Sequence, residues 1–265
     1  MKHPTFVYPT NTKAVSLTGS SCAMKCPWCE GRYLKNMLQL PQIGELPAPP
    51  ESLLISGGWN AGGQIPWEEN FPALKRLREG GIRLNLHFGI FRNEKTALLK
   101  ELSPLISYDF LLDDELLQLS GFGFKAAEVL KSYEALLATD LEVVPHLLLG
   151  RNRGRLSGDF SLLETLAAYR PQKAVFLIFI PTPGTAFETF FPPEIEQLEK
   201  IFSQAREKLP QTALILGCMR PGGAYRIKID RLALKHQFNK IVMPAPQIRK
   251  TIPQALIQSQ CCAFD

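Results

Sequence analysis

Short apolar runs alternate with amphipathic segments along most of the chain. The runs typical of strands lie at residues 14–18, 52–56, 82–88, 108–112, 141–149, 174–180, 213–218 and 240–243. Residues 174–180 (AVFLIFI) are almost continuously apolar, as in a strand buried on both faces. Apolar residues at three- and four-residue spacing predict helices between these runs, at residues 71–77, 94–102, 159–169, 193–209, 229–238 and 248–258.

Glycine, proline and helix-capping residues indicate where several of these predicted elements begin or end. Gly80-Gly81 closes the helix after residue 77, and Asn93 is a candidate N-terminal cap of helix 94–102. A long helical stretch after strand 108–112 reaches residue 137 and is interrupted at two glycines, Gly121 and Gly123. Residues 1–13 are expected to be irregular, and residues 41–50 form a proline-rich connector.

The alternation of strands and helices predicts an α/β fold with a parallel sheet. Eight strand-then-helix units in 265 residues favour one (β/α)8 barrel of the TIM type, which typically takes about 250 residues. We therefore expect one domain over residues 1–265, with functional groups at the C-terminal ends of the strands.

Composition excludes some classes of protein. The chain is 45% hydrophobic and 21% charged, no apolar run approaches the ~20 residues of a membrane span, and the N-terminus has no apolar signal segment. These features predict a soluble, cytoplasmic protein with no membrane partner. The formal net charge of +5 comes without a Lys/Arg block interleaved with aromatics, so a nucleic-acid partner is not expected.

The candidate chemistry centres on Cys22, Cys26 and Cys29, which follow strand 14–18. Three cysteines at this spacing can hold three irons of a cubane cluster and leave the fourth iron open to a ligand. A disulfide framework is disfavoured by the absence of a signal segment. A zinc site would need a distant fourth ligand such as Cys218, and buried structural cysteines would not lie beside Lys25.

The C-x3-C-x2-C loop resembles that of the radical S-adenosylmethionine (SAM) superfamily, including the aromatic residue Trp28 before the third cysteine. The resemblance implies that Cys22, Cys26 and Cys29 bind a [4Fe-4S] cluster. Its open iron would chelate SAM, and reductive cleavage of SAM would give a 5′-deoxyadenosyl radical. An electron donor such as ferredoxin or flavodoxin is implied as well.

Further candidates for SAM binding lie at other predicted strand ends. Ser56, Gly57 and Gly58 occupy the place of the glycine pair that meets the SAM amino group in this superfamily, although they could also form an ordinary turn. Asp109 is a candidate for the ribose, with helix capping as the alternative. Arg151 could pair with the SAM carboxylate or be a surface charge.

The other three cysteines, Cys218, Cys261 and Cys262, are enough for a second iron–sulfur cluster. The predicted tail, residues 247–265, carries two of them, and Ser259 or Arg220 is a possible fourth ligand. The alternative is a frayed tail with Cys218 merely packed. A final helix of about 11 residues would descend about 16 Å from the active face, so the tail must return or the helix must be shorter.

Several segments together resemble the biotin-synthase-like proteins that act in pairs as a two-component lipoyl synthase. These segments are LTGSSCAMKCPWCEGRYLKNM, LLISGGWNAGG, FLIFIPTPGT, LGCMRPGGAYRIKID and the terminal CCAF. The resemblance implies that Cys218, Cys261 and Cys262 hold an auxiliary [4Fe-4S] cluster that donates sulfur to C6 or C8 of an octanoyl chain. The implied partners are an octanoylated lipoyl carrier domain and a paralogous second component.

The sequence departs from the radical SAM pattern at Trp59, where an acidic residue is common, and in the element Gly150-Arg151-Asn152-Arg153-Gly154. Two other interpretations stay open. One is a single-cluster radical SAM enzyme, such as a mutase, a methyltransferase or an RNA-modifying enzyme. The other is a metal-binding scaffold that never cleaves SAM.

Overall fold

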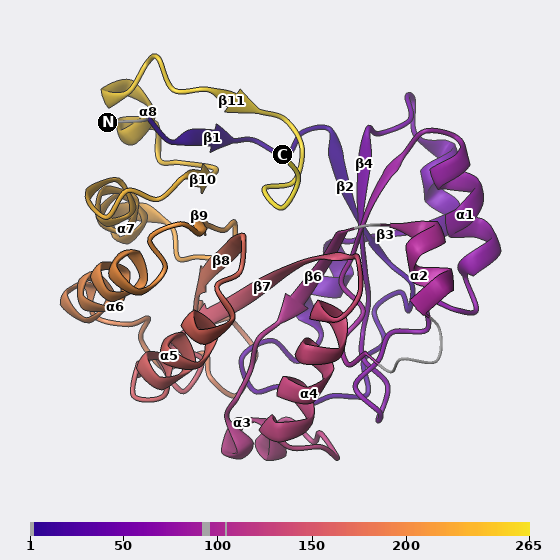
Figure 1. The fold of residues 1–265 in the computed structure, drawn as a ribbon, viewed down its shortest axis with the longest axis horizontal. Helices are drawn as coiled ribbons and strands as arrows, with labels where there is room; N and C mark the ends of the chain where they lie inside the picture. Colours follow the sequence, from indigo (N-terminus) through magenta and orange to yellow (C-terminus); the bar gives the residue numbers. More distant parts are fainter. Residues whose placement is uncertain (1–2, 92–95, 104) are drawn as a thin grey trace. The chain divides into compact units, whose positions relative to one another are not determined.

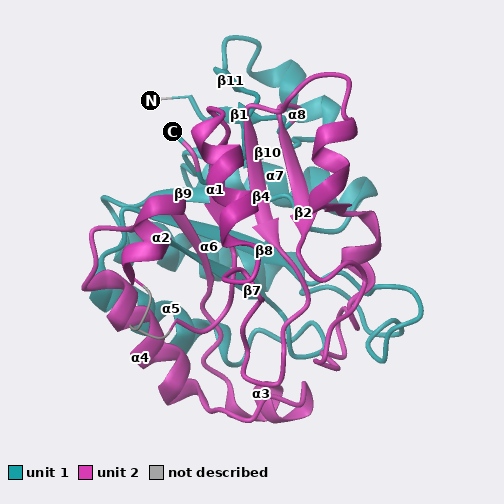
Figure 2. Ribbon diagram, turned by 90° about the vertical axis from the view of Figure 1, so that its right-hand side faces the viewer, with its two compact units in different colours: residues 1–9, 144–263, 265 teal, residues 10–143, 264 magenta. Residues whose placement is uncertain are grey.

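A computed structural model describes residues 3–91, 96–103 and 105–265 of the chain. It divides into two compact units (Figure 2). Unit 2 comprises residues 10–143 and Phe264, and unit 1 comprises residues 1–9, 144–263 and Asp265. Asn93, the expected cap of helix 94–102, lies outside the described residues.

Unit 2 is a parallel sheet with the strand order β6-β5-β4-β2-β3. Its strands are β2 (Thr12–Ser16), β3 (Leu38–Gln39), β4 (Ser52–Ser56), β5 (Arg83–Leu86) and β6 (Leu105–Asp109). Its α-helices are α1 (Phe71–Glu79), α2 (Thr96–Leu102), α3 (Asp114–Leu119) and α4 (Ala126–Leu137), with 3-10 turns η1 (Arg32–Asn36) and η2 (Leu40–Glu45). Strand β4 coincides with the predicted run 52–56.

Unit 1 is also a parallel sheet, in the order β11-β1-β10-β9-β8-β7. Its strands are β1 (Thr5–Val7), β7 (Glu142–Leu149), β8 (Lys173–Ile178), β9 (Ala213–Leu216), β10 (Lys240–Val242) and β11 (Ile257–Gln258). Its helices α5 (Asp159–Tyr169), α6 (Ile195–Lys208), α7 (Gly223–Lys235) and α8 (Pro246–Thr251) form a row in which each packs against the next (Figure 1).

An aromatic cluster packs the helices onto unit 1. Phe176 of β8 contacts Phe202 of α6 and Phe238 after α7, with ring centroids 6.2 and 5.4 Å apart. The rings of Phe202 and Phe238 are 4.6 Å apart. Because each ring is buried, each contributes about 1.5–3 kcal/mol from apolar burial alone. The apolar pattern of residues 174–180 is thus explained by helices on this face of β8.

Two ends of the chain depart from the sequence pattern. Residues 1–13, expected to be irregular, contain β1, which pairs in parallel with β10 and β11. The expected last helix, residues 248–258, is instead the short helix α8 followed by β11. Pro253 within the expected helix explains its early end, because proline removes a helical hydrogen bond. The tail therefore runs back in the direction of the strands.

Three internal boundaries also differ. Strand β6 covers residues 105–109 rather than 108–112, because the apolar run continues into Phe110 and Leu111, which are buried beyond the sheet. The long helix after it is divided into α3 and α4, as the two glycines indicated. Helix α7 begins at Gly223 rather than residue 229, because its first turn is solvent-facing and has no apolar periodicity.

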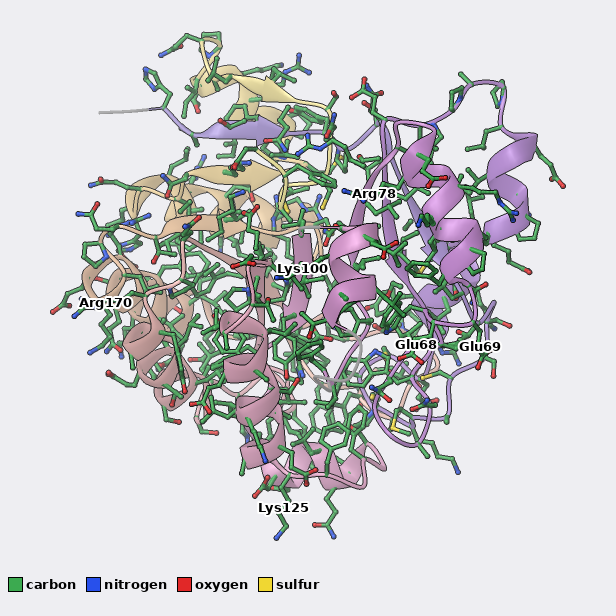
Figure 3. The ribbon with its side chains drawn as sticks, turned by 45° about the vertical axis from the view of Figure 1, so that its right-hand side comes forward. Glu68, Glu69, Arg78, Lys100, Lys125 and Arg170 are labelled. Carbon is green, nitrogen blue, oxygen red and sulfur yellow. The ribbon has the colours of Figure 1, made fainter. Side chains whose placement is uncertain are left out.

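Exposed charges cover the outer surfaces of both units. Glu68, Glu69 and Lys125 in unit 2 and Arg170 in unit 1 are exposed, and Figure 3 labels their positions. Lys100 forms an ion pair with Asp140, with Nζ 2.6 Å from Oδ2. None of the described helices has both the length and the apolar character needed to cross a membrane.

Candidate functional site

The cysteine loop leaves the C-terminal end of β2 and lies in unit 2. Cys26 and Trp28 are buried, whereas Cys22 and Cys29 are half-buried. Neighbouring β4 pairs along all five residues of β2 and ends at Ser56, so the predicted SAM-binding residues Ser56, Gly57 and Gly58 follow the adjacent strand end. The structure thus brings the cysteine loop and the glycine pair together, as the strand order of a parallel sheet requires.

Backbone hydrogen bonds hold the loop in shape. The amides of Cys29 and Glu30 both donate to the carbonyl of Cys26, at 3.0 and 2.9 Å. The amide of Ala23 donates to the Trp59 carbonyl at 2.9 Å, and the amide of Lys25 donates to the Ser120 carbonyl at 3.0 Å. The bonds of Ala23 and Lys25 fasten the segment between Cys22 and Cys26 to the rest of unit 2, and those of Cys29 and Glu30 form a turn within the loop, so the thiols are organised by the chain itself.

Gly58 has a direct structural role in this loop. A Cβ built on residue 58 would lie 1.9 Å from the carbonyl oxygen of Ser21 and 2.7 Å from Cβ of Cys22. The amide of Gly58 donates to Oγ1 of Thr18 at 2.6 Å, and that hydroxyl donates to the Ser21 carbonyl at 2.9 Å. The glycine therefore allows the cysteine loop to approach β4. Sequence reasoning missed Thr18, for which a hydroxyl after an apolar strand is only a weak signal.

Asp109 is the last residue of β6 and lies beside His87, which follows the adjacent strand β5. Oδ2 of Asp109 is 3.2 Å from Nε2 of His87, and both side chains are partly exposed. Deeper in the same two strands, the hydroxyl of Ser107 donates to Oδ1 of Asn85 at 3.0 Å. Asp109 and His87 are therefore a partly exposed polar pair above the buried hydrogen bond between Ser107 and Asn85. Such polar groups can form hydrogen bonds with the hydroxyl groups of a ligand.

The other aspartate of this region has a capping role. Oδ1 of Asp113 accepts from the Leu116 amide at 3.0 Å at the N-terminus of α3. This contact satisfies one of the amides that a helix leaves unpaired at its start. Asp113 is therefore the residue that caps the helix. Asp109, for which helix capping was the alternative to ribose binding, is instead the last residue of β6.

Arg151 belongs to unit 1 and is buried, at 7% exposure, so it is not a surface charge. It follows Gly150, whose φ of 70° favours glycine and whose added Cβ would lie 2.2 Å from Cγ of Pro193. Its neighbour Arg153 is exposed and lies over the rings of Phe187 and Phe190, at 5.6 and 5.7 Å from their centroids. The two arginines therefore have different environments, and only Arg151 is enclosed.

The three remaining cysteines lie together in unit 1. A hydrogen bond with Cys261 and burial raise the pKa of the Cys262 thiol, and the charges of Cys261 and Cys218 raise it further while Lys240 lowers it. Burial and the neighbouring Cys261 raise the pKa of the Cys218 thiol, although that residue keeps solvent exposure. The three cysteines come together because strand β11 pairs in parallel with β1. This pairing brings the residues after β11, including Cys261 and Cys262, back toward Cys218, which follows β9.

Arg220, a possible fourth ligand, is engaged elsewhere. Its Nη2 lies 2.9 Å from Oδ1 of Asp230, both side chains are fully buried, and its guanidinium also donates to the carbonyls of Gly217 and Met243. Oδ2 of Asp230 accepts from the Ala245 amide at 2.7 Å. Burial lowers the pKa of Arg220, and Asp230 opposes this shift. The guanidinium thus ties the ends of β9 and β10 together.

All six cysteines lie in the described part of the chain, and none of them forms a disulfide. Among the described residues, no three His, Cys, Asp or Glu side chains are placed to hold one metal ion. A cubane distributes its thiolates over different irons, so its ligands surround a cluster rather than a single point. The donor sets Cys22/Cys26/Cys29 and Cys218/Cys261/Cys262 fit such clusters in ligand type and number.

Comparisons with known proteins identify the fold. No protein-family model and no curated protein sequence matches this chain. The structure is similar to methylornithine synthase (PylB), with a TM-score of 0.67 and 16% identity over 92% of this chain and 73% of that chain. It is also similar to the FeFe-hydrogenase maturase HydG from Carboxydothermus hydrogenoformans, with a TM-score of 0.65 and 16% identity over 90% of this chain and 58% of HydG.

A third similar structure is anSMEcpe with bound AdoMet and the Cp18Cys peptide. It has a TM-score of 0.50 and 10% identity over 76% of this chain and 59% of that chain. The chain thus spans less than two thirds of HydG and of anSMEcpe. At these identities the likeness establishes the fold alone, a parallel α/β fold with helices between the strands, similar to that of methylornithine synthase (PylB). The fold class predicted from the strand–helix alternation is confirmed.

Proposed function

We propose that this protein is a radical SAM enzyme that inserts sulfur into an octanoyl chain carried on a protein domain, as one component of a two-protein lipoyl synthase. The observation that carries the proposal is the meeting of Cys218, Cys261 and Cys262 in unit 1. A second thiol set beyond the Cys22/Cys26/Cys29 loop is what a sulfur-inserting enzyme needs and what a single-cluster enzyme does not use.

In this proposal Cys22, Cys26 and Cys29 of unit 2 would hold a [4Fe-4S] cluster, which would supply the reductive cleavage of SAM. The chain's own residues orient SAM. Gly58 keeps the loop against β4, and Asp109 at the rim of β6 accepts a hydrogen bond from a ribose hydroxyl. The pairing of Arg151 with the SAM carboxylate stays a prediction from the sequence.

The second thiol set would hold the auxiliary cluster that supplies sulfur. Cys218 keeps solvent exposure, whereas Cys262 is buried, so the set has one accessible side. The expected partners are an acidic octanoylated carrier domain, attracted by the +5 net charge, a paralogous component for the second sulfur, and a reductant such as ferredoxin or flavodoxin.

An iron and sulfide count tests the proposal. Anaerobically reconstituted wild-type protein is expected to bind about eight irons, and the Cys22/Cys26/Cys29→Ala variant about four. Replacing Cys218, Cys261 and Cys262 by alanine instead should also leave about four, while 5′-deoxyadenosine formation from SAM and dithionite continues. A wild-type count of about four that falls to none in the first variant would contradict the sulfur-insertion proposal.

The alternative function is a single-cluster radical SAM enzyme. The hydrogen bond between Cys261 and Cys262 favours it, because two thiols that satisfy each other can be packing residues. Under this alternative the Cys218, Cys261 and Cys262 variants keep full activity on the true substrate and the full iron content. Absence of 5′-deoxyadenosine from the wild-type protein would instead favour a non-enzymatic scaffold.

A further inference from the structure

Two lysines, Lys173, which is buried, and Lys240, which is half-buried, face the tail of the chain from the strands of unit 1. Lys173 is the first residue of β8, and Lys240 is the first residue of β10. Both Lys240 and Val175 are in register with Ile215 of β9, so all three side chains lie on one face of the sheet. Because side chains alternate along a strand, Lys173 shares that face with Val175.

This face is opposite the helices. Phe176, next to Val175 in β8, packs against Phe202 of α6 and Phe238. A parallel sheet usually has apolar residues on both faces, and a lysine that is 8% exposed in its side chain is a departure from that pattern. The two lysines therefore need partners within unit 1.

The C-terminal segment, residues 261–265, provides those partners. Nζ of Lys240 donates to the carbonyl of Cys262 at 3.3 Å. Nζ of Lys173 donates to the carbonyl of Ala263 at 3.0 Å and lies 2.6 Å from Oδ1 of Asp265. Two ammonium groups thus bind two successive carbonyls and one carboxylate of the same short segment.

Other contacts show that the segment has a defined position. Nε2 of Gln258 in β11 donates to the carbonyl of Cys261 at 2.9 Å. Cys262 and Ala263 are buried although they lie outside any helix or strand. Phe264 of the same segment is buried as well, so apolar burial contributes about 1.5–3 kcal/mol to holding this segment. The charged hydrogen bonds from the lysines add to this burial and act directly on the backbone of Cys262 and Ala263.

We propose that Lys173 and Lys240 are positioning residues that fasten residues 261–265 so that Cys261 and Cys262 face Cys218. Lys240 also places a positive charge beside the thiolates. This inference deepens the proposed function, because the thiolates are those proposed to hold the auxiliary cluster. Three thiolates bring three negative charges, and an ammonium beside them offsets part of their mutual repulsion.

The first test measures the position of the segment without any cluster. Hydrogen exchange of the amides of residues 259–265 is compared in the full chain, in the Lys240→Met variant and in the Lys173→Met variant. Methionine keeps most of the apolar stem and removes the charge. Losing a hydrogen bond from a charged group should speed exchange by about tenfold or more. Lys240→Arg keeps the charge and should retain most of the protection.

The second test measures the cluster. In the Cys22/Cys26/Cys29→Ala background, the remaining iron is challenged with a chelator. Loss of a supporting residue around metal ligands typically costs 10–100-fold in metal affinity, so Lys240→Met should lose iron about 10–100-fold faster. Lys235→Met is the matched control, because it removes a lysine of the same unit that pairs with Glu199 on an exposed helix surface.

The outcomes separate this inference from the proposed function. Faster exchange in both methionine variants, with Lys235→Met unchanged, supports the positioning role even if the background variant binds no iron. If the Cys22/Cys26/Cys29→Ala variant binds no iron, the sulfur-insertion proposal is contradicted, but the positioning role of the two lysines is not. Unchanged exchange in Lys173→Met and Lys240→Met would overturn the positioning role, whatever the iron content.

Discussion

Gly58 lies so close to Cys22 that a Cβ on the glycine would be 2.7 Å from Cβ of the cysteine. The glycine after β4 therefore acts on the cysteine loop itself, in addition to any contact with a ligand. Its amide is engaged by Thr18 at 2.6 Å, which leaves SAM contacts in this region to other groups. This close approach by itself requires a glycine at position 58. The requirement holds whatever residue follows, including Trp59, which stands where radical SAM proteins commonly have an acidic residue.

Gly58→Ala should displace the cysteine loop. The added methyl group overlaps the Ser21 carbonyl and Cys22, and overpacking of this kind costs about 1–3 kcal/mol. We expect loss of the iron bound by Cys22, Cys26 and Cys29, measured by iron analysis after reconstitution. Gly123→Ala is the control, because a Cβ there meets no atom within 4 Å. Equal iron content in both variants would contradict the loop-packing role.

Thr18→Val should weaken the same loop by a different route. The hydroxyl accepts from the Gly58 amide and donates to the Ser21 carbonyl, and leaving such groups without partners costs about 1–3 kcal/mol. We expect a lower urea midpoint and faster iron loss to a chelator. Thr18→Ser keeps the hydroxyl and should behave as the wild type, so a defect in Thr18→Ser together with a normal Thr18→Val would assign the role to the methyl group instead.

Asp109 and Asp113 form a matched pair for testing SAM binding. If Asp109 accepts a hydrogen bond from the ribose, Asp109→Ala should weaken SAM binding about tenfold, measured by equilibrium dialysis with the cluster-loaded protein. Asp113→Ala removes the cap of α3 and should cost about 1 kcal/mol of stability with little change in SAM affinity. The ribose assignment fails if both variants bind SAM as the wild type does.

Removing one member of the buried ion pair Arg220–Asp230 should destabilise the fold strongly, whereas replacing both members by apolar residues should destabilise it much less. Arg220→Met leaves the Asp230 carboxylate buried without its counter-charge, for which we expect a loss of about 3–5 kcal/mol in the free energy of unfolding. The double variant Arg220→Met/Asp230→Leu should recover much of that loss, because apolar residues can replace a buried ion pair. Denaturant unfolding of the single and double variants measures both values, and a double variant no more stable than Arg220→Met would contradict this account.

Local sequence patterns predict the parts of this fold that depend on local hydrophobicity. Strand β4 and helix α5 match the expected residues 52–56 and 159–169, because their apolar periods are regular and their ends coincide with glycines or polar turns. Strand β6 was misplaced by three residues, because the apolar run extends past the residues that pair with β5. Hydrophobicity marks burial, whereas the strand ends where hydrogen bonding to a neighbour ends.

In the candidate site, too, some features follow from the local sequence and others depend on the tertiary structure. The sequence by itself determined the cysteine loop after the first long strand and the strand-end placement of Asp109 and Arg151, because a short loop keeps its residues near the strand that it follows. Only the tertiary structure brought Cys261 and Cys262 to Cys218. That meeting depends on β1 and β11, strands of three and two residues that pair across almost the whole chain. Strands so short have no local signal, because their stability comes from partners distant in sequence.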